Sequence, residues 1–157
     1  MSALQIHQFA CLDDNYGYLL HDPDAGLTAS IDSPDAAAIE RELAARGWKL
    51  DYILNTHHHA DHAGGNLALK ARTGCSIVGA RADADRIPGI DVLVCEGDRF
   101  ALGKHGARII ETPGHTRAHV CYLFEADRAA FVGDTLFSMG CGRLFEGTPE
   151  QMWGSLQ

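Results

Sequence analysis

The segment that most limits how this chain can fold lies at residues 50–62. Residues 50–55, LDYILN, form a short apolar run bounded by polar residues, which predicts a buried strand rather than a helix. The next seven residues, THHHADH, hold four of the nine histidines of the 157-residue chain. A helix at about 64–72 is predicted to follow and to end at Gly74. The fold must therefore join a buried strand, a histidine-rich turn and a helix in direct succession.

The spacing of these side chains is that of metal ligands. Side chains at i and i+2 of an extended chain share a face, so His57 and His59 can converge on one ion while His58 points away. Where the chain turns into the helix, Asp61 and His62 can reach a second ion nearby. These ligands suit zinc, iron or manganese, and the lack of a cysteine pair argues against a closed structural zinc site. A solvated loop or an expression tag is the alternative, but a tag would be terminal and would not contain Asp61 between ligand-spaced histidines.

Two further candidate ligands lie where later strands end. His115 stands in the Pro-Gly turn of TPGHT, residues 112–116, and Asp134 ends the apolar strand in FVGDT, residues 131–135. Alone, each fits a loop or cap residue, but beside the 57–62 cluster each fits a ligand. Asp134 can bridge two metals through its two oxygens. We expect His119 to orient the loop rather than bind metal, and Asp32 to be a turn or supporting residue without a chemical role.

The remaining elements alternate between strand and helix, which predicts one α+β domain. Ser33 is expected to cap a helix that starts at Pro34 and ends before Gly47. A capping box at 148–151, with Pro149 at the first helical position, predicts a last helix from about 149. The predicted strands lie at 15–20, 27–31, 50–55, 76–79, 91–95, 108–111, 119–125 and 129–133.

Composition excludes several classes of function. The chain has 13 Lys+Arg and 21 Asp+Glu, a net charge of −8, which disfavours nucleic-acid binding. No apolar run approaches the ~18 residues of a membrane span, and the first residues lack the pattern of a signal peptide. Five cysteines, an odd number without a CxxC pair, argue against a disulfide framework and for small buried side chains. We therefore expect a cytoplasmic monomer that acts on a small molecule, without nucleic-acid or membrane partners.

The motifs THHHADH, TPGHT and FVGDTLF resemble those of the metallo-β-lactamase superfamily. Within it, residues 133–152, GDTLFSMGCGRLFEGTPEQM, and residues 13–16, DDNY, are similar to the glyoxalase II (hydroxyacylglutathione hydrolase) family. The resemblance implies a four-layer αβ/βα sandwich with two divalent metal ions, most often zinc. It also implies hydrolysis of S-D-lactoylglutathione to D-lactate and glutathione, a step of methylglyoxal detoxification.

The resemblance also assigns roles to individual residues. It implies that the second metal is held by Asp61 and His62, that Asp61 orients the attacking water, and that Asp134 bridges both metals. Arg143 matches a basic position that contacts a glutathione carboxylate, and Phe145 stands where family members often have Tyr, which removes a hydroxyl contact. The residues implied for the first metal are His57, His59 and His115.

The family continues beyond this point with a further strand, which bears another histidine ligand, and a helical substrate-binding domain. For the domain at 1–157 we therefore expect a tightly bound first metal, a weakly bound second metal and low thioesterase activity unless a partner chain completes the site. One alternative is a persulfide dioxygenase with mononuclear iron held by His57, His115 and Asp134. Another is an inactive metal-binding fragment. β-Lactamases and phosphodiesterases share the metal motif but not the 133–152 stretch.

Overall fold

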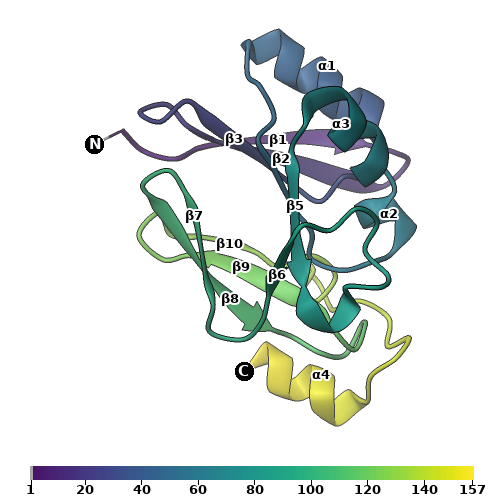
Figure 1. The fold of residues 1–157 in the computed structure, drawn as a ribbon. Helices are drawn as coiled ribbons and strands as arrows, with labels where there is room; N and C mark the ends of the chain where they lie inside the picture. The colour runs from purple at the N-terminus through teal and green to yellow at the C-terminus, as the bar shows by residue number, and fades with distance from the viewer. Residues whose placement is uncertain (1) are drawn as a thin grey trace.

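The computed structural model describes residues 2–157 as two β-sheets that face each other, with helices on the outer side of each (Figure 1). The six-stranded sheet has the order β1-β2-β3-β4-β5-β6, and the four-stranded sheet has the order β10-β9-β8-β7. The strands of the first sheet are Gln5–Cys11, Asn15–Asp22, Leu27–Ile31, Tyr52–Leu54, Ser76–Ala80 and Val92–Val94. Those of the second, from β7 to β10, are Arg99–Leu102, His105–Glu111, Val120–Phe124 and Ala129–Phe131.

The helices complete four layers. Helices α1 (Ala36–Arg46) and α3 (Asn66–Thr73) cover the outer face of the six-stranded sheet, and α4 (Pro149–Leu156) lies beyond the four-stranded sheet (Figure 1). The short α2 (Ala60–Ala63) and the 3-10 turn η1 (Arg81–Asp83) follow strands β4 and β5. This arrangement confirms the predicted α+β sandwich of the αβ/βα type.

The central strands are apolar on both faces because each face meets a different core. Strands β3 to β6 run parallel, and neighbouring residues of β4 and β5 are fully buried in pairs. Leu54 and Val78 belong to the core between the sheets, whereas Ile53 and Ile77 belong to the core beneath the helices. Successive side chains of a strand point to opposite faces, so a strand between two cores needs an unbroken apolar run. This is why the centre of the predicted 50–55 strand, Tyr52–Leu54, forms a strand, while its two ends do not.

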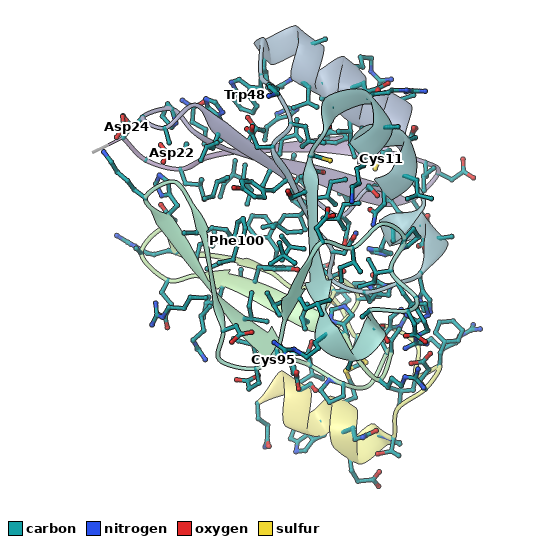
Figure 2. The ribbon with its side chains drawn as sticks, in the orientation of Figure 1. Cys11, Asp22, Asp24, Trp48, Cys95 and Phe100 are labelled. Carbon is teal, nitrogen blue, oxygen red and sulfur yellow. The ribbon has the colours of Figure 1, made fainter. Side chains whose placement is uncertain are left out.

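The core between the sheets is closed by aromatic side chains. Figure 2 shows Phe100 of β7 between the two sheets, where its ring meets that of Tyr52 edge-on at a centroid distance of 5.1 Å. Tyr122 of β9 is completely buried, and its hydroxyl donates a 2.7 Å hydrogen bond to the carbonyl of Asn55. Because Asn55 begins the histidine-rich turn, this bond joins the second sheet to the start of the predicted metal site.

The start of α1 corrects one prediction. Asp35, not Ser33, is the N-cap, and its carboxylate accepts the backbone N–H groups of Ala37 and Ala38. The hydroxyl of Ser33 instead donates a 2.6 Å hydrogen bond to Asn66 of α3. Because the Ser33 hydroxyl bonds a residue far along the chain, it does not cap the helix, which begins at Ala36 after Asp35. The predicted end at Gly47 is confirmed, since that residue has φ +67°, a conformation that favours glycine.

Two strands of the structure were not predicted. Strand β1 pairs antiparallel with β2, and β7 pairs antiparallel with β8. Both lie at an edge of their sheet, with one face partly exposed, and their sequences QIHQFAC and RFAL lack the clear apolar pattern of a central strand. The hairpin of β9 and β10 and the capping box of α4 are confirmed.

The structure places the five cysteines in different surroundings: Cys95 is half-buried and Cys141 is exposed. All five cysteines are free, and Cys11, Cys75 and Cys121 are buried. Cys11 and Cys95 lie in well-separated parts of the molecule (Figure 2). Across residues 2–157, none of the helices combines the length and the apolar character needed to cross a membrane.

Candidate metal centre

The predicted ligands come from three connections that meet beside the two sheets. Strands β3 and β4 are parallel neighbours, so the residues after them, Asp32 and the 55–62 turn, lie at the same edge of the sheet. His115 lies in the connection between β8 and β9, and Asp134 follows β10 of the same sheet. Because the two sheets face each other, they bring together residues that are up to 77 positions apart in sequence, from His57 to Asp134.

Three imidazoles converge on one point. The Nδ1 atom of His59 lies 3.2 Å from Nε2 of His57 and 3.1 Å from Nε2 of His115. Tetrahedral zinc with Zn–N bonds of about 2.0–2.1 Å sets its ligand nitrogens about 3.3 Å apart. Burial and the neighbouring imidazoles lower the pKa of His57 far below its ordinary value, and burial lowers the pKa of His59. The three rings therefore form a nitrogen donor set of the right size for a divalent metal.

A second group of donors adjoins the first. Nε2 of His62 lies 3.2 Å from Oδ1 of Asp134, while the other oxygen of that carboxylate, Oδ2, lies 3.2 Å from Nε2 of His115. His57, His62 and Asp134 are also close enough to hold one ion. The carboxylate of Asp134 thus faces both groups, one oxygen to each, as a bridging ligand would.

Asp61 lies at the exposed rim of the second group. Its Oδ2 is 3.5 Å from Nε2 of His62, and its side chain is 52% exposed. It is outside the two compact donor groups, so its role as a metal ligand stays a prediction. The side-chain amide of Asn15 donates a 3.1 Å hydrogen bond to the backbone carbonyl of Asp61, which fixes this end of the turn to β2.

Asp32 has the supporting role that the sequence indicated, and the structure shows which groups it supports. It is buried, and its Oδ1 accepts the backbone N–H of Thr56 at 2.7 Å, while its Oδ2 lies 2.8 Å from the Thr56 hydroxyl and 2.8 Å from Nδ1 of His62. Burial lowers the pKa of His62, but the carboxylates of Asp32 and Asp134 outweigh it and raise this pKa to about 10. Asp32 therefore orients His62 so that Nε2 faces the second group. In the sequence, the only local indication of this supporting role was the position of Asp32 directly after a strand.

Other residues behind the ligands hold their rings and backbone. Nδ1 of His115 donates a 2.7 Å hydrogen bond to the backbone carbonyl of Arg143, which leaves the lone pair of Nε2 available to bind a metal. Nε2 of His119 accepts the backbone N–H of Asp134 at 3.1 Å, and its Nδ1 lies 2.9 Å from the hydroxyl of Thr112. Burial lowers the pKa of His119 to about 3, so it stays a neutral acceptor. The prediction that His119 orients the loop is confirmed.

The predicted substrate residues lie beside the first group. The ring of Phe145 meets the rings of His59 and His115, each at a centroid distance of 5.3 Å, and it is 58% exposed. The guanidinium carbon of Arg143 lies 5.6 Å from the centre of the Phe145 ring. The two side chains form an exposed cationic and aromatic surface at the mouth of the site.

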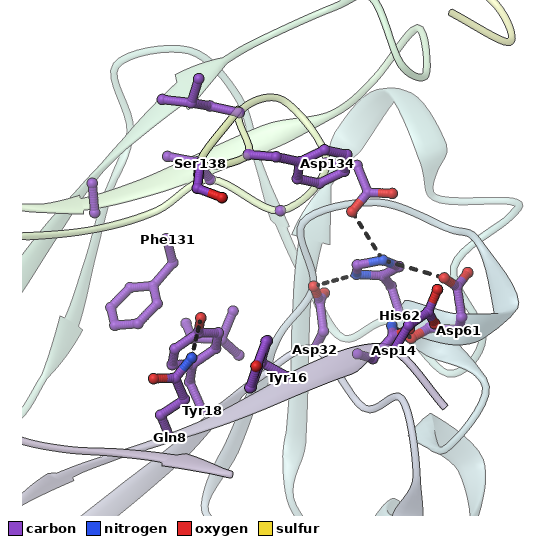
Figure 3. A pocket seen from close by; sticks show the side chains of 17 residues that line it. Gln8, Asp14, Tyr16, Tyr18, Asp32, Asp61, His62, Phe131, Asp134 and Ser138 are labelled. Carbon is purple, nitrogen blue, oxygen red and sulfur yellow. Dashed lines mark hydrogen bonds and ion pairs between the residues drawn. The ribbon is translucent and has the colours of Figure 1, made fainter. Parts of the chain in front are cut away.

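A cavity of about 620 Å³ opens on the other side, against the second group (Figure 3). Figure 3 shows His62 at one end of this cavity, in contact with Asp32, Asp61 and Asp134, and Phe131 and Tyr18 further along it. The volume is in the range of small-molecule sites. Arg143 and Phe145 do not line this cavity, so the two groups of donors have openings of different character.

Two sheets with flanking helices and a histidine-rich donor set at one edge define the class of protein. The family model described as the metallo-beta-lactamase superfamily matches residues 24–155, and the chain belongs to that superfamily. Hydroxyacylglutathione hydrolase of Maricaulis maris is 58% identical over 156 residues, which are 99% of this chain and 61% of that relative. The enzyme of the same name from Methylococcus capsulatus is 57% identical over 98% of this chain and 60% of its own length. The chain thus spans about 60% of the length of these curated relatives.

Solved structures agree on the fold. ETHE1 from Myxococcus xanthus aligns with a TM-score of 0.85 at 31% identity, over 97% of this chain and 68% of that protein. The BLEG-1 B3 metallo-beta-lactamase aligns with a TM-score of 0.85 over 97% of this chain and 83% of its own, at 22% identity, which is a likeness of fold alone.

Proposed function

We propose that this chain carries the metal centre of a glutathione thioester hydrolase, with S-D-lactoylglutathione as substrate and D-lactate and glutathione as products. The observation that carries the proposal is the 58% identity, over nearly the whole chain, to a protein named hydroxyacylglutathione hydrolase. The geometry supports it, because a carboxylate that faces two donor groups suits a site with two metals.

The proposed ligands are the donors of the two groups, with Asp61 added from the family resemblance. His57, His59 and His115 hold the first ion, His62 and Asp61 hold the second, and Asp134 is shared. Zinc is the preferred metal, with iron or manganese as alternatives, because imidazole and carboxylate donors accept all three. Bound divalent metal at such a site polarises a thioester carbonyl and lowers the pKa of a water molecule.

The chain's own residues then do three things. His57, His59 and His115 direct their nitrogens at one point, and burial lowers the pKa of His57 and that of His59. Asp134 stays ionised, because His62 outweighs the effect of burial and lowers its pKa. Asp61, exposed at the rim, orients the attacking water toward the carbonyl. The leaving group is a thiolate, which departs without strong help from a general acid.

The substrate is proposed to lie over the exposed surface formed by Arg143 and Phe145. Arg143 is exposed, with its guanidinium beside the Phe145 ring, so it can pair with a carboxylate of glutathione. Phe145 offers an apolar contact beside His59 and His115, where the thioester must lie for hydrolysis.

The test is a thiol-release assay on S-D-lactoylglutathione, with zinc-reconstituted chain and the metal content measured on the same sample. We expect thiol release that is lost in the Asp134→Ala variant and kept in Glu40→Gln, a change far from the donors. Bound metal without thiol release would refute the proposal for this chain. Oxygen uptake with glutathione persulfide by the iron-loaded chain would favour the dioxygenase alternative instead. Monomeric state and cytoplasmic location stay predictions.

A further inference from the structure

A charged network lies directly behind the donor groups and contains none of the proposed ligands. The guanidinium of Arg86, just after η1, donates to Glu146 through Nη1 at 2.5 Å and through Nη2 at 3.2 Å. Its Nε donates to Asp83 at 2.9 Å. Arg86 and Glu146 are 60 residues apart in sequence, so this pair joins two distant connections of the fold.

One end of the network holds the histidine-rich turn. Asp83 is completely buried, and its Oδ2 accepts a hydrogen bond from Nδ1 of His58 at 3.1 Å. Nε2 of His58 faces Nη1 of Arg86 at 3.3 Å. His58 stands between the proposed ligands His57 and His59. Its ring turns to Asp83 and Arg86 rather than to the donor groups, as predicted, and it anchors the turn to them.

At the other end of the network, Glu146 belongs to the segment 142–147, which bonds the proposed ligands His115 and Asp134. Glu146 Oε2 accepts the backbone N–H of Arg117 at 2.7 Å. Within the same segment, the carbonyl of Arg143 accepts Nδ1 of His115 at 2.7 Å, and the N–H of Phe145 donates to the carbonyl of His115 at 3.2 Å. The N–H of Gly142 donates to the carbonyl of Asp134 at 2.9 Å. The position of this segment therefore sets the ring of His115 and the backbone of Asp134.

We propose that Arg86 and Glu146 are positioning residues that hold the 142–147 segment against the histidine-rich turn and so set the spacing of the metal ligands before metal binds. His57 and His59 come from the first sheet and His115 from the second, so this spacing depends on contacts that cross between the sheets. Groups behind metal ligands commonly change metal affinity 10–100-fold when they are altered. The inference rests on the proposed metal site.

The pair is well built for this role. Arg86 and Glu146 have side chains only 22% and 26% exposed, so water screens them less than a surface pair. The hydrogen bond from Arg86 lowers the pKa of Glu146 to about 2, so both groups remain charged at neutral pH. The fork of the guanidinium reaches Asp83 and Glu146 together, a geometry that the single ammonium of lysine does not reproduce.

The test measures metal affinity rather than turnover. Glu146→Gln keeps an oxygen for the Arg117 N–H and removes the charge, and Arg86→Lys keeps the charge and removes the fork. Glu40→Gln is the matched control, since Glu40 pairs with Arg72 at 2.6 Å between α1 and α3, away from the donors. Each metal-free chain is titrated with Co²⁺ or Zn²⁺ in competition with a chelator, and its circular dichroism and thermal unfolding are recorded.

We expect Glu146→Gln and Arg86→Lys to bind the first ion at least tenfold more weakly than the unaltered chain, with a shifted visible spectrum of bound Co²⁺ and unchanged circular dichroism. Glu40→Gln should stay within twofold. Unaltered affinity in both site variants, an equal loss in the control, or failure of both variants to fold would overturn the inference. An unaltered chain that binds metal but leaves the thioester intact refutes only the proposed function, whereas one that binds no metal refutes both.

Discussion

Asp32 gives the most informative single substitution, because it bonds the backbone of the histidine-rich turn and one proposed ligand at once. In Asp32→Asn, the amide oxygen must keep the place of Oδ1, since the buried N–H of Thr56 needs an acceptor there. The new NH₂ group then faces Nδ1 of His62, where an oxygen stood at 2.8 Å. His62 must accept that bond and carry its own proton on Nε2, the atom that faces Asp134. In the unaltered chain a metal can displace the proton of Nε2 while Nδ1 keeps its own proton for the Asp32 carboxylate, but in the variant a ring with its proton on Nδ1 would point that proton at the new NH₂ group.

The expected size of the effect follows from the bonds exchanged. Three hydrogen bonds to the charged Asp32 carboxylate, each worth about 1.5–3 kcal/mol, become bonds to a neutral amide, each worth about 0.5–1.5 kcal/mol. The metal-free chain should therefore lose about 3–4 kcal/mol of stability, which for a domain of this size lowers Tm by about 6–16 °C. Metal affinity at His62 should fall further, about 10–100-fold, because the tautomer is wrong as well.

The assay is a calorimetric zinc titration of the metal-free chains, with Asp22→Asn as the control. Asp22 is equally buried and accepts the backbone N–H groups of Asp24, Ala25 and Lys104, but it contacts none of the proposed ligands. We expect the control to lose stability and keep full metal affinity. Zinc binding by Asp32→Asn with the unaltered affinity and stoichiometry would refute the tautomer argument.

Three further predictions follow from single contacts. Tyr122→Phe leaves the carbonyl of Asn55 without its buried partner and should cost about 1–3 kcal/mol, measured by urea unfolding of the metal-free chain; an unchanged midpoint would contradict it. Glu146 has a folded-state pKa of about 2, below its ordinary value, so its pairing with Arg86 stabilises the fold above about pH 4.5 and is lost as the pH falls toward 2. The stability difference between the unaltered chain and Glu146→Gln should therefore shrink from pH 6 to pH 2, and a constant difference would contradict the assignment. Asp134→Ala should lower the zinc stoichiometry of the chain, because one carboxylate faces both donor groups; full stoichiometry would show that the carboxylate is not shared.

The sequence indicated the first donor group because the information is local. His57 and His59 are two residues apart in an extended turn, so their convergence needs only the geometry of the chain between them. His115 and Asp134 were found from their positions at the ends of strands, and the facing of the two sheets brings them to the same place. The strand Tyr52–Leu54, within the predicted 50–55, was predictable because a strand between two cores has an uninterrupted apolar run.

The contacts that the sequence did not reveal join residues far apart along the chain. Asp32 meets His62 across 30 positions, and Arg86 meets Glu146 across 60. Nothing local distinguishes such residues from a turn aspartate or a surface ion pair. The misplaced start of α1 has the same cause, since Ser33 has a cap residue's side chain but bonds Asn66 instead. Long-range polar contacts, not propensities, account for these differences.

The place of β4 has a consequence for how the site responds to thermal motion. This strand lies inside the six-stranded sheet, paired on both sides and apolar on both faces, and the histidine-rich turn begins one residue after it. Local opening starts where backbone amides are least protected, at edge strands and exposed connections. The amides of Ile53 and Leu54 should therefore exchange with solvent only in the rarest, near-global openings. The proposed ligands that follow β4 should therefore keep their spacing while the edge strands of both sheets open and close locally.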